Sequence, residues 1–131
     1  MTRLILILGD QLSDDVAALR AADPSTDIVV MAEVMSEATY VRHHPKKIAF
    51  ILAAMRKFAA RLRKAGWTVE YTDLDDTENS GSIIGELIRR AAQHNTDKVI
   101  ATEPGEWRLI QALNEAPLTV QVLEDNRFLA S

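Results

Sequence analysis

The sequence predicts an α/β protein built on an open sheet of five parallel strands, with helices on both faces. The first observation is a run of residues 4–8 that is apolar at every position, as expected of a strand buried on both faces. The second is that five short apolar runs alternate along the chain with longer segments of helical periodicity. Strict alternation of this kind is typical of a parallel sheet whose crossover helices cover it.

The first strand and helix occupy the start of the chain. Leu4 to Leu8 forms the first strand and ends at Gly9. Ser13 can cap a helix whose first turn is acidic, and we expect this helix to end near Ala22. Ile28 to Ala32 is the second apolar strand.

A long amphipathic helix should begin at Pro45, because proline is favoured in the first turn of a helix. Gly66 is a natural C-terminal stop. Apolar residues at helical spacing form its core stripe, namely Ile48, Ile51, Leu52, Met55, Phe58, Ala59 and Leu62. Basic residues lie on the opposite face, namely Lys57, Arg61 and Lys64.

The remaining segments continue the alternation of strands and helices. They are a strand at Trp67 to Thr72, a helix at Ser82 to His94, a strand at Lys98 to Ala101, a helix at Trp107 to Leu113 and a strand at Thr119 to Leu123. In the helix after Ser82 we expect six apolar residues to face inward, namely Ile83, Ile84, Leu87, Ile88, Ala91 and Ala92. The order is therefore that of a Rossmann-like fold, and all 131 residues form one domain.

Composition narrows the possible functions. A hydrophobic content of 47% indicates a packed domain, and a net charge of −4 argues against a main DNA-binding surface here. The chain has no cysteine, which excludes disulfides and thiolate ligands within it. Its apolar start is too short for a signal peptide or a membrane span. We therefore expect a cytoplasmic protein that does not contact a membrane.

Acidic and amide side chains follow the predicted strands. They are Asp10 and Gln11 after Gly9, then Glu33, Asp73 and Glu103. Open α/β sheets bind ligands at the carboxyl ends of their strands. The sequence has neither a GxGxxG nor a GxxxxGK(S/T) motif, the two glycine-rich motifs that bind phosphate. This edge therefore suits a neutral ligand rich in N–H and O–H donors.

Any one of these acids taken alone is more simply explained as a cap of the following helix. The better ligand candidates are Gly9, Asp10, Gln11 and Glu37, because Ser13 and Ser36 offer separate caps.

Other candidate groups are less specific. His43 and His44 could suggest a metal ligand or a base, but adjacent residues rarely face one target, and a basic turn is the simpler interpretation. Trp67 and Trp107 are expected to pack in or beside the core. No serine, histidine and aspartate have a spacing that suggests a nucleophile, and no catalytic residue is proposed. An acid at residue 73 resembles the phosphorylation site of receiver domains, but no lysine follows the fifth strand.

Four segments together resemble the amino-terminal domain of the deoxyribodipyrimidine photolyase-related proteins. They are GDQLS at 9–13, the long segment 37–58, EPGEWRL at 103–109 and LEDNRFLAS at 123–131. This family comprises bacterial (6-4) photolyases and cryptochromes that carry an iron-sulfur cluster. Its members are flavoproteins that repair (6-4) photoproducts in DNA or sense light. The resemblance therefore implies that this segment is not itself an enzyme and that its parent protein is a DNA photolyase.

The resemblance also implies a ligand and partners. The amino-terminal domain would hold 6,7-dimethyl-8-ribityllumazine as an antenna chromophore. FAD, a 4Fe-4S cluster and the main surface for damaged DNA would belong to a helical carboxyl-terminal region outside these residues, which Phe128 and Leu129 could contact. Carried over by position, the cofactor-binding residues would be Gly9, Asp10, Gln11, Glu37, Tyr40, Ile48 and Ile51, with Glu103 as a further candidate. No metal ligand is implied.

Two other functions fit the same fold class. A stand-alone nucleotide-binding domain, similar to the universal stress proteins, would require a phosphate-binding loop that the sequence lacks. An interaction module would use the basic face formed by Lys57, Arg61 and Lys64.

Overall fold

The computed structural model describes residues 2–34 and 45–124, except for the side chains of residues 45–48. The predicted Glu37, Tyr40, His43, His44, Phe128 and Leu129 lie outside the described residues. The strands are β1 (Leu4–Leu6), β2 (Ile28–Ala32), β3 (Thr68–Thr72), β4 (Lys98–Thr102) and β5 (Thr119–Leu123). The helices are α1 (Ala17–Arg20), α3 (Pro45–Lys64), α4 (Ile83–Gln93) and α5 (Trp107–Glu115).

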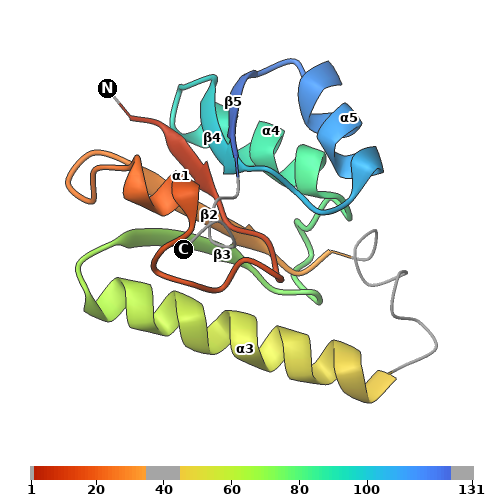
Figure 1. Ribbon diagram of the computed structural model, residues 1–131. Coiled ribbons are helices and arrows are strands. Elements are labelled where there is room, and N and C mark those ends of the chain that lie inside the picture. Colours follow the sequence, from red (N-terminus) through yellow and green to blue (C-terminus); the bar gives the residue numbers. More distant parts are fainter. Residues whose placement is uncertain (1, 35–44, 125–131) are drawn as a thin grey trace.

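The five strands form one parallel sheet in the order β3-β2-β1-β4-β5. Figure 1 shows α3 lying along one face of this sheet, with α4 and α5 on the other. The predicted α/β class, the five parallel strands and the helices on both faces are therefore confirmed. Within the described residues, no helix is both long and apolar enough to cross a membrane.

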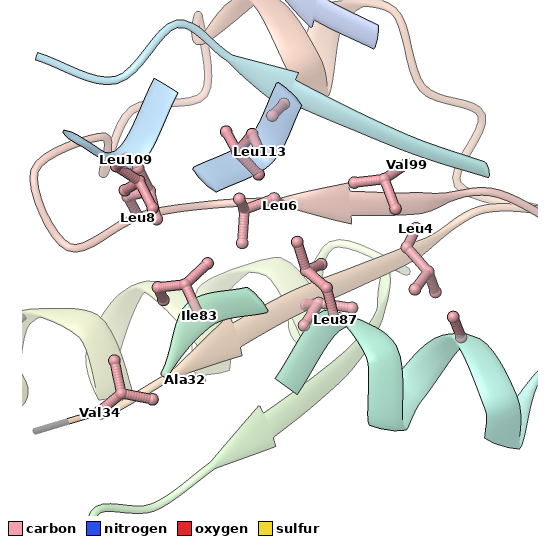
Figure 2. Close-up of a cluster of buried hydrophobic side chains, with 13 residues drawn as sticks. Leu4, Leu6, Leu8, Ala32, Val34, Ile83, Leu87, Val99, Leu109 and Leu113 are labelled. Carbon is pink, nitrogen blue, oxygen red and sulfur yellow. The ribbon is translucent and has the colours of Figure 1, made fainter. Parts of the chain in front are cut away.

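The first strand is at the centre of the sheet because its side chains are apolar on both faces. Alternate residues point to opposite sides of a strand. Leu4, Leu6 and Leu8 pack into the core beneath α4 and α5, where Figure 2 shows them beside Leu87 and Leu109. The residues between them, Ile5 and Ile7, join the second core cluster, to which α1 and α3 contribute.

The long helix α3 covers the second core cluster with the predicted stripe. Met55, Phe58, Ala59 and Leu62 are buried, whereas Ile51 and Leu52 are half-buried at the edge of the cluster. The chain turns after the helix at Gly66, whose φ of 104° is one that glycine adopts without strain. The basic residues Lys57, Arg61 and Lys64 are exposed, as predicted.

The first helix is shorter than predicted. It begins at Ala17, its N-cap is Val16, and no side chain caps it. The Ser13 hydroxyl instead accepts a hydrogen bond of 3.2 Å from the Asp15 N–H. The Ser13 hydroxyl thus stabilises a local turn with the residue two positions later and does not cap a helix. The prediction of a helix starting at Ser13 is therefore wrong.

The helix α4 is capped by Ser82, whose hydroxyl accepts a hydrogen bond of 2.9 Å from the Gly85 N–H. Ile83, Leu87 and Ala91 are its buried apolar residues, at a spacing of four. The inward orientation predicted for Ile88 and Ala92 is wrong, because both side chains are exposed. Each follows a buried residue, Leu87 or Ala91, by one position and so points away from the sheet. They line an open groove with Leu118 instead of packing on the sheet.

The two tryptophans differ in environment. Trp67 is half-buried and packs against the core beneath α3, as predicted. Trp107 is 69% exposed, so the packing predicted for it is wrong. The reason is helical geometry, because α5 buries Leu109 and Leu113 and a residue two positions earlier faces about 200° away.

Candidate functional site

The sheet topology places a ligand-binding edge between β1 and β4. The chain moves outward from β1 to β2 and β3, then returns to add β4 and β5 on the other side of β1. Leu6 pairs with Ala101, so the carboxyl ends of these two strands lie side by side. In open α/β sheets the crevice beyond such a reversal point binds ligands. The predicted Gly9, Asp10, Gln11 and Glu103 all follow these two strands.

The loop after β1 approaches the long helix closely at Gly9. A Cβ atom built on Gly9 would lie 3.2 Å from the Met55 sulfur and 3.3 Å from Ile51 Cγ2. Both distances are shorter than ordinary van der Waals contact. Gly9 therefore lets α3 reach the end of the first strand, which positions the half-buried Ile51 at the carboxyl edge.

Asp10 and Glu103 carry exposed carboxylates at this edge. Both side chains are exposed, and they follow adjacent strands. The backbone of Glu103 is fixed, because its N–H donates a hydrogen bond of 2.7 Å to the carbonyl oxygen of Leu123. Exposed carboxylates accept hydrogen bonds from hydroxyl and N–H groups, so the edge can recognise a ligand rich in donors.

Gln11 is buried, with 2% of its surface exposed. Its Oε1 accepts a hydrogen bond of 3.2 Å from the Leu8 N–H, and its Nε2 donates one of 3.1 Å to the carbonyl oxygen of Thr102. These bonds hold the end of β1 against the end of β4. Gln11 therefore builds the edge, and its amide does not face outward.

Thr102 extends this support to the first helix. Its Oγ1 accepts a hydrogen bond of 2.9 Å from the Ala18 N–H in the first turn of α1. Thr102 has no exposed surface, so the bond is sheltered from water. The end of β4 is thus held both by the loop after β1 and by α1, which makes this edge rigid.

The remaining predicted site residues are described in part or not at all. Ile48 lies in the first turn of α3, and its side chain is outside the described atoms. Glu37 and Tyr40 precede this helix and are outside the described residues. The described part of the site thus brings together Gly9 and Ile51, with Asp10 and Glu103 at the same edge.

Glu33, one of the acids predicted at the strand ends, is directed into the protein. Its side chain has no exposed surface, and its Oε2 accepts hydrogen bonds from Arg56 Nε at 2.6 Å and from the Tyr71 hydroxyl. Its Oε1 accepts from Arg56 Nη2 at 2.8 Å and from the Leu74 N–H at 2.9 Å. Burial alone would raise the pKa of Glu33, but these bonds outweigh it and lower the pKa. All its acceptor positions are used, so it cannot serve a ligand.

A second buried acid, Glu86, was not foreseen. It is 1% exposed and accepts hydrogen bonds from Arg89, from the Thr72 hydroxyl, and from the N–H and hydroxyl of Ser80. Burial would raise its pKa, but these donors lower it to about 2. Its burial could have been predicted from its position, because Glu86 follows Ile83 by three residues and precedes Leu87 by one on the apolar stripe of α4.

The described residues contain no group of three or more His, Asp or Glu that could hold a metal ion. What they offer at the carboxyl edge is two exposed carboxylates on a backbone held by hydrogen bonds, together with the half-buried side chain of Ile51. Such an edge can bind and orient a ligand.

The sequence is similar to known proteins over its whole length. Residues 5–131 match the model of a family described as deoxyribodipyrimidine photo-lyase-related protein. A protein named (6-4) photolyase, from Agrobacterium fabrum, is 47% identical over 135 aligned residues. The alignment covers 100% of this chain and 27% of that relative, so the chain spans about a quarter of the relative's length.

Proposed function

The chain belongs to the deoxyribodipyrimidine photo-lyase-related protein family, and on that premise we propose that it is the antenna-chromophore-binding part of a light-driven flavoprotein. The family match covers residues 5–131. The match to only 27% of the (6-4) photolyase supports a role as one part of a longer protein. The site supports binding and not bond-making chemistry.

The proposed ligand is 6,7-dimethyl-8-ribityllumazine, which has a ring with a single N–H group and a polyol tail that carries hydroxyl donors. The observation that carries this assignment is the carboxyl edge of β1 and β4, where Asp10 and Glu103 expose their carboxylates and Gly9 closely approaches the half-buried Ile51. Carboxylates accept hydrogen bonds from the tail, and an aliphatic side chain packs on the ring. The residues present therefore fit this chromophore.

Each residue has a distinct role in the proposal. Asp10 and Glu103 accept hydrogen bonds, and Ile51, together with Ile48, forms the apolar wall. Gly9 and Gln11 shape the edge from within, as their contacts indicate. Glu37 and Tyr40 contribute from the preceding segment, as the resemblance to the family implies.

An antenna requires a fixed chromophore and no catalytic group. When bound, the lumazine supplies absorption of light and transfer of the energy to a flavin. The protein must hold the ring at one position and keep it away from water, and groups on rigid strand ends and helices do this best. The bonds from Gln11 and Thr102 supply such rigidity.

The longer protein would carry the remaining functions. We propose that it binds FAD and a 4Fe-4S cluster outside these residues and acts in light-driven repair of (6-4) photoproducts or in light sensing. Damaged DNA would bind mainly there, since this chain has a net charge of −4. Because bacterial DNA lies in the cytoplasm, the same proposal places the protein in that compartment.

Co-expression with lumazine synthase tests the proposed function. The 131-residue chain purified from such cells should carry an absorption band in the near-ultraviolet or blue region that is absent from chain made without the synthase. A folded chain that purifies without the band under saturating lumazine contradicts the proposal. Thermal stabilisation by ATP and not by lumazine would instead support a nucleotide-binding domain.

A further inference from the structure

One polar connection between α3 and the sheet lies near the proposed site. Ile51 and Met55, which contact Gly9, are on the same helix as Arg56. Arg56 forms a bidentate salt bridge with Glu33, with Nε 2.6 Å from Oε2 and Nη2 2.8 Å from Oε1. Glu33 directly follows β2, so this pair joins the helix to the carboxyl edge of the sheet.

Glu33 is itself held from several sides. Its N–H donates a hydrogen bond of 2.9 Å to the carbonyl oxygen of Thr72, and its own carbonyl oxygen accepts one of 2.8 Å from the Asn79 side chain. The Tyr71 hydroxyl and the Leu74 N–H donate to its carboxylate. The carboxylate is therefore a fixed point on the sheet, to which the Arg56 side chain is anchored.

The other described contacts between α3 and the sheet are mainly apolar, with one further polar link, a hydrogen bond of 2.9 Å from Arg63 Nη2 to the carbonyl oxygen of Val69 in β3. Burial of apolar surface is not directional, so a stripe of Met55, Phe58 and Leu62 permits small shifts along the helix axis. A two-pronged bond between a guanidinium and a carboxylate adds geometric specificity, because both donors must meet both oxygens. The pair from Arg56 to Glu33 therefore fixes the part of the helix nearest the carboxyl edge, while the bond from Arg63 to Val69 holds its C-terminal end.

We propose that Glu33 and Arg56 are positioning residues that set the location of α3 at the carboxyl edge and thereby place Ile51 in the chromophore site. This rests on the proposed function for the identity of the ligand. Neither residue touches the ligand in this proposal. Glu33 is wholly buried, and Arg56 acts through the helix that it anchors.

The first experiment measures the helix position without any ligand. The chain has no cysteine, so Ala53→Cys on α3 and Gly105→Cys after β4 provide two unique sites for spin labels. Ala53 is exposed, and a Cβ at Gly105 meets no atom within 4 Å. The distance between the labels should be narrowly distributed in the parent chain. Arg56→Lys should shift or broaden this distribution, because lysine keeps the positive charge but cannot form the bidentate bond.

Arg61→Lys is the matched control. Arg61 is on the same helix and pairs with Asp14 at 2.9 Å, but both side chains are largely exposed. Its substitution should leave the distance distribution unchanged, because exposed ion pairs contribute little. Equal distributions in the parent, Arg56→Lys and Arg56→Met would overturn the positioning role.

The second experiment measures lumazine binding. Arg56→Lys should weaken binding by roughly tenfold, the lower end of the loss seen when a residue that orients a metal ligand is changed. Leu62→Ala, which destabilises the same helix far from Glu33, should weaken binding less at an equal or greater loss of melting temperature. Binding losses that simply follow melting temperature across these variants contradict the proposal. A parent chain that binds no lumazine contradicts the proposed function, while the label distances still decide whether the pair positions the helix.

Discussion

The side chain of Gln11 donates a hydrogen bond of 3.1 Å to the carbonyl oxygen of Thr102, 91 residues later in the sequence, and so joins the loop after β1 to the end of β4. The same side chain accepts a bond from the Leu8 N–H. The buried side-chain amide of Gln11 therefore bridges the loop after β1 and the end of β4, where the strand order reverses. Ligand contacts are left to the exposed Asp10 and Glu103.

Replacing Gln11 should destabilise the fold. Gln11→Ala leaves the Leu8 N–H and the Thr102 carbonyl oxygen without these partners in a buried place, which costs about 1–3 kcal/mol per group. We expect a drop of about 2–4 kcal/mol in the free energy of unfolding, measured by urea denaturation. Asp10→Ala is the control, since this neighbouring side chain is exposed and should change stability by less than about 0.5 kcal/mol. Similar stability of both variants would contradict the bridging role.

Gly9→Ala should destabilise the protein by about 1 kcal/mol, because the new methyl group crowds Met55 and Ile51. Gly105→Ala should have little effect, since a Cβ there meets nothing within 4 Å. Shortening Met55 to alanine in the same chain should reduce the cost of Gly9→Ala, because the nearest atom is then removed. A double-mutant cycle measures this coupling, and strictly additive effects would argue against the close approach.

Acid should weaken the fold partly through Glu86. Its pKa is about 2 in the folded protein and 4.5 in a free side chain, so the folded state binds fewer protons between these values. Its contribution, about 2–3 kcal/mol, is complete above about pH 4.5 and is lost as the pH falls towards 2. Urea unfolding across pH 7 to 2.5 should therefore show a shallower acid dependence for Glu86→Gln.

The matched control for this pH dependence is Glu78→Gln. Glu78 also pairs with Arg89, but at 3.4 Å and with 73% of its side chain exposed. Its substitution should leave the acid dependence nearly unchanged. Parallel stability curves for the parent and Glu86→Gln would show that the buried carboxylate is not the group responsible.

Ser82→Ala should cost about 1 kcal/mol of stability, because the Gly85 N–H in the first turn of α4 loses its acceptor. Ser13→Ala should cost less, since its hydroxyl serves an exposed turn and caps no helix. Thermal unfolding of the two variants checks the difference. Equal losses would indicate that Ser13 also supports α1.

The sequence predicted the sheet well because the evidence for it is local. The apolar run at residues 4–8 and the alternation of strands and helices do not depend on distant partners. The helix predicted from Ser82 is equally local, since the Ser82 hydroxyl bonds within the first turn of α4.

Pairings between distant residues could not be predicted. Gln11 was expected to face a ligand, and Glu33 was one of the acids predicted at the strand ends, yet their partners Thr102 and Arg56 are 91 and 23 residues away. Only the packed fold brings these groups together. Asp10, Ile51 and Glu103 lie where the ligand-binding edge was predicted, while their contact with a chromophore stays a prediction.

The most direct test of the chromophore proposal is equilibrium dialysis of the 131-residue chain against 6,7-dimethyl-8-ribityllumazine. We expect saturable binding of a single lumazine per chain, weakened by Asp10→Ala but not by Asp15→Ala, an exposed acid in the following turn. A folded chain that shows no saturable binding, or variants that bind equally, would contradict the proposed site.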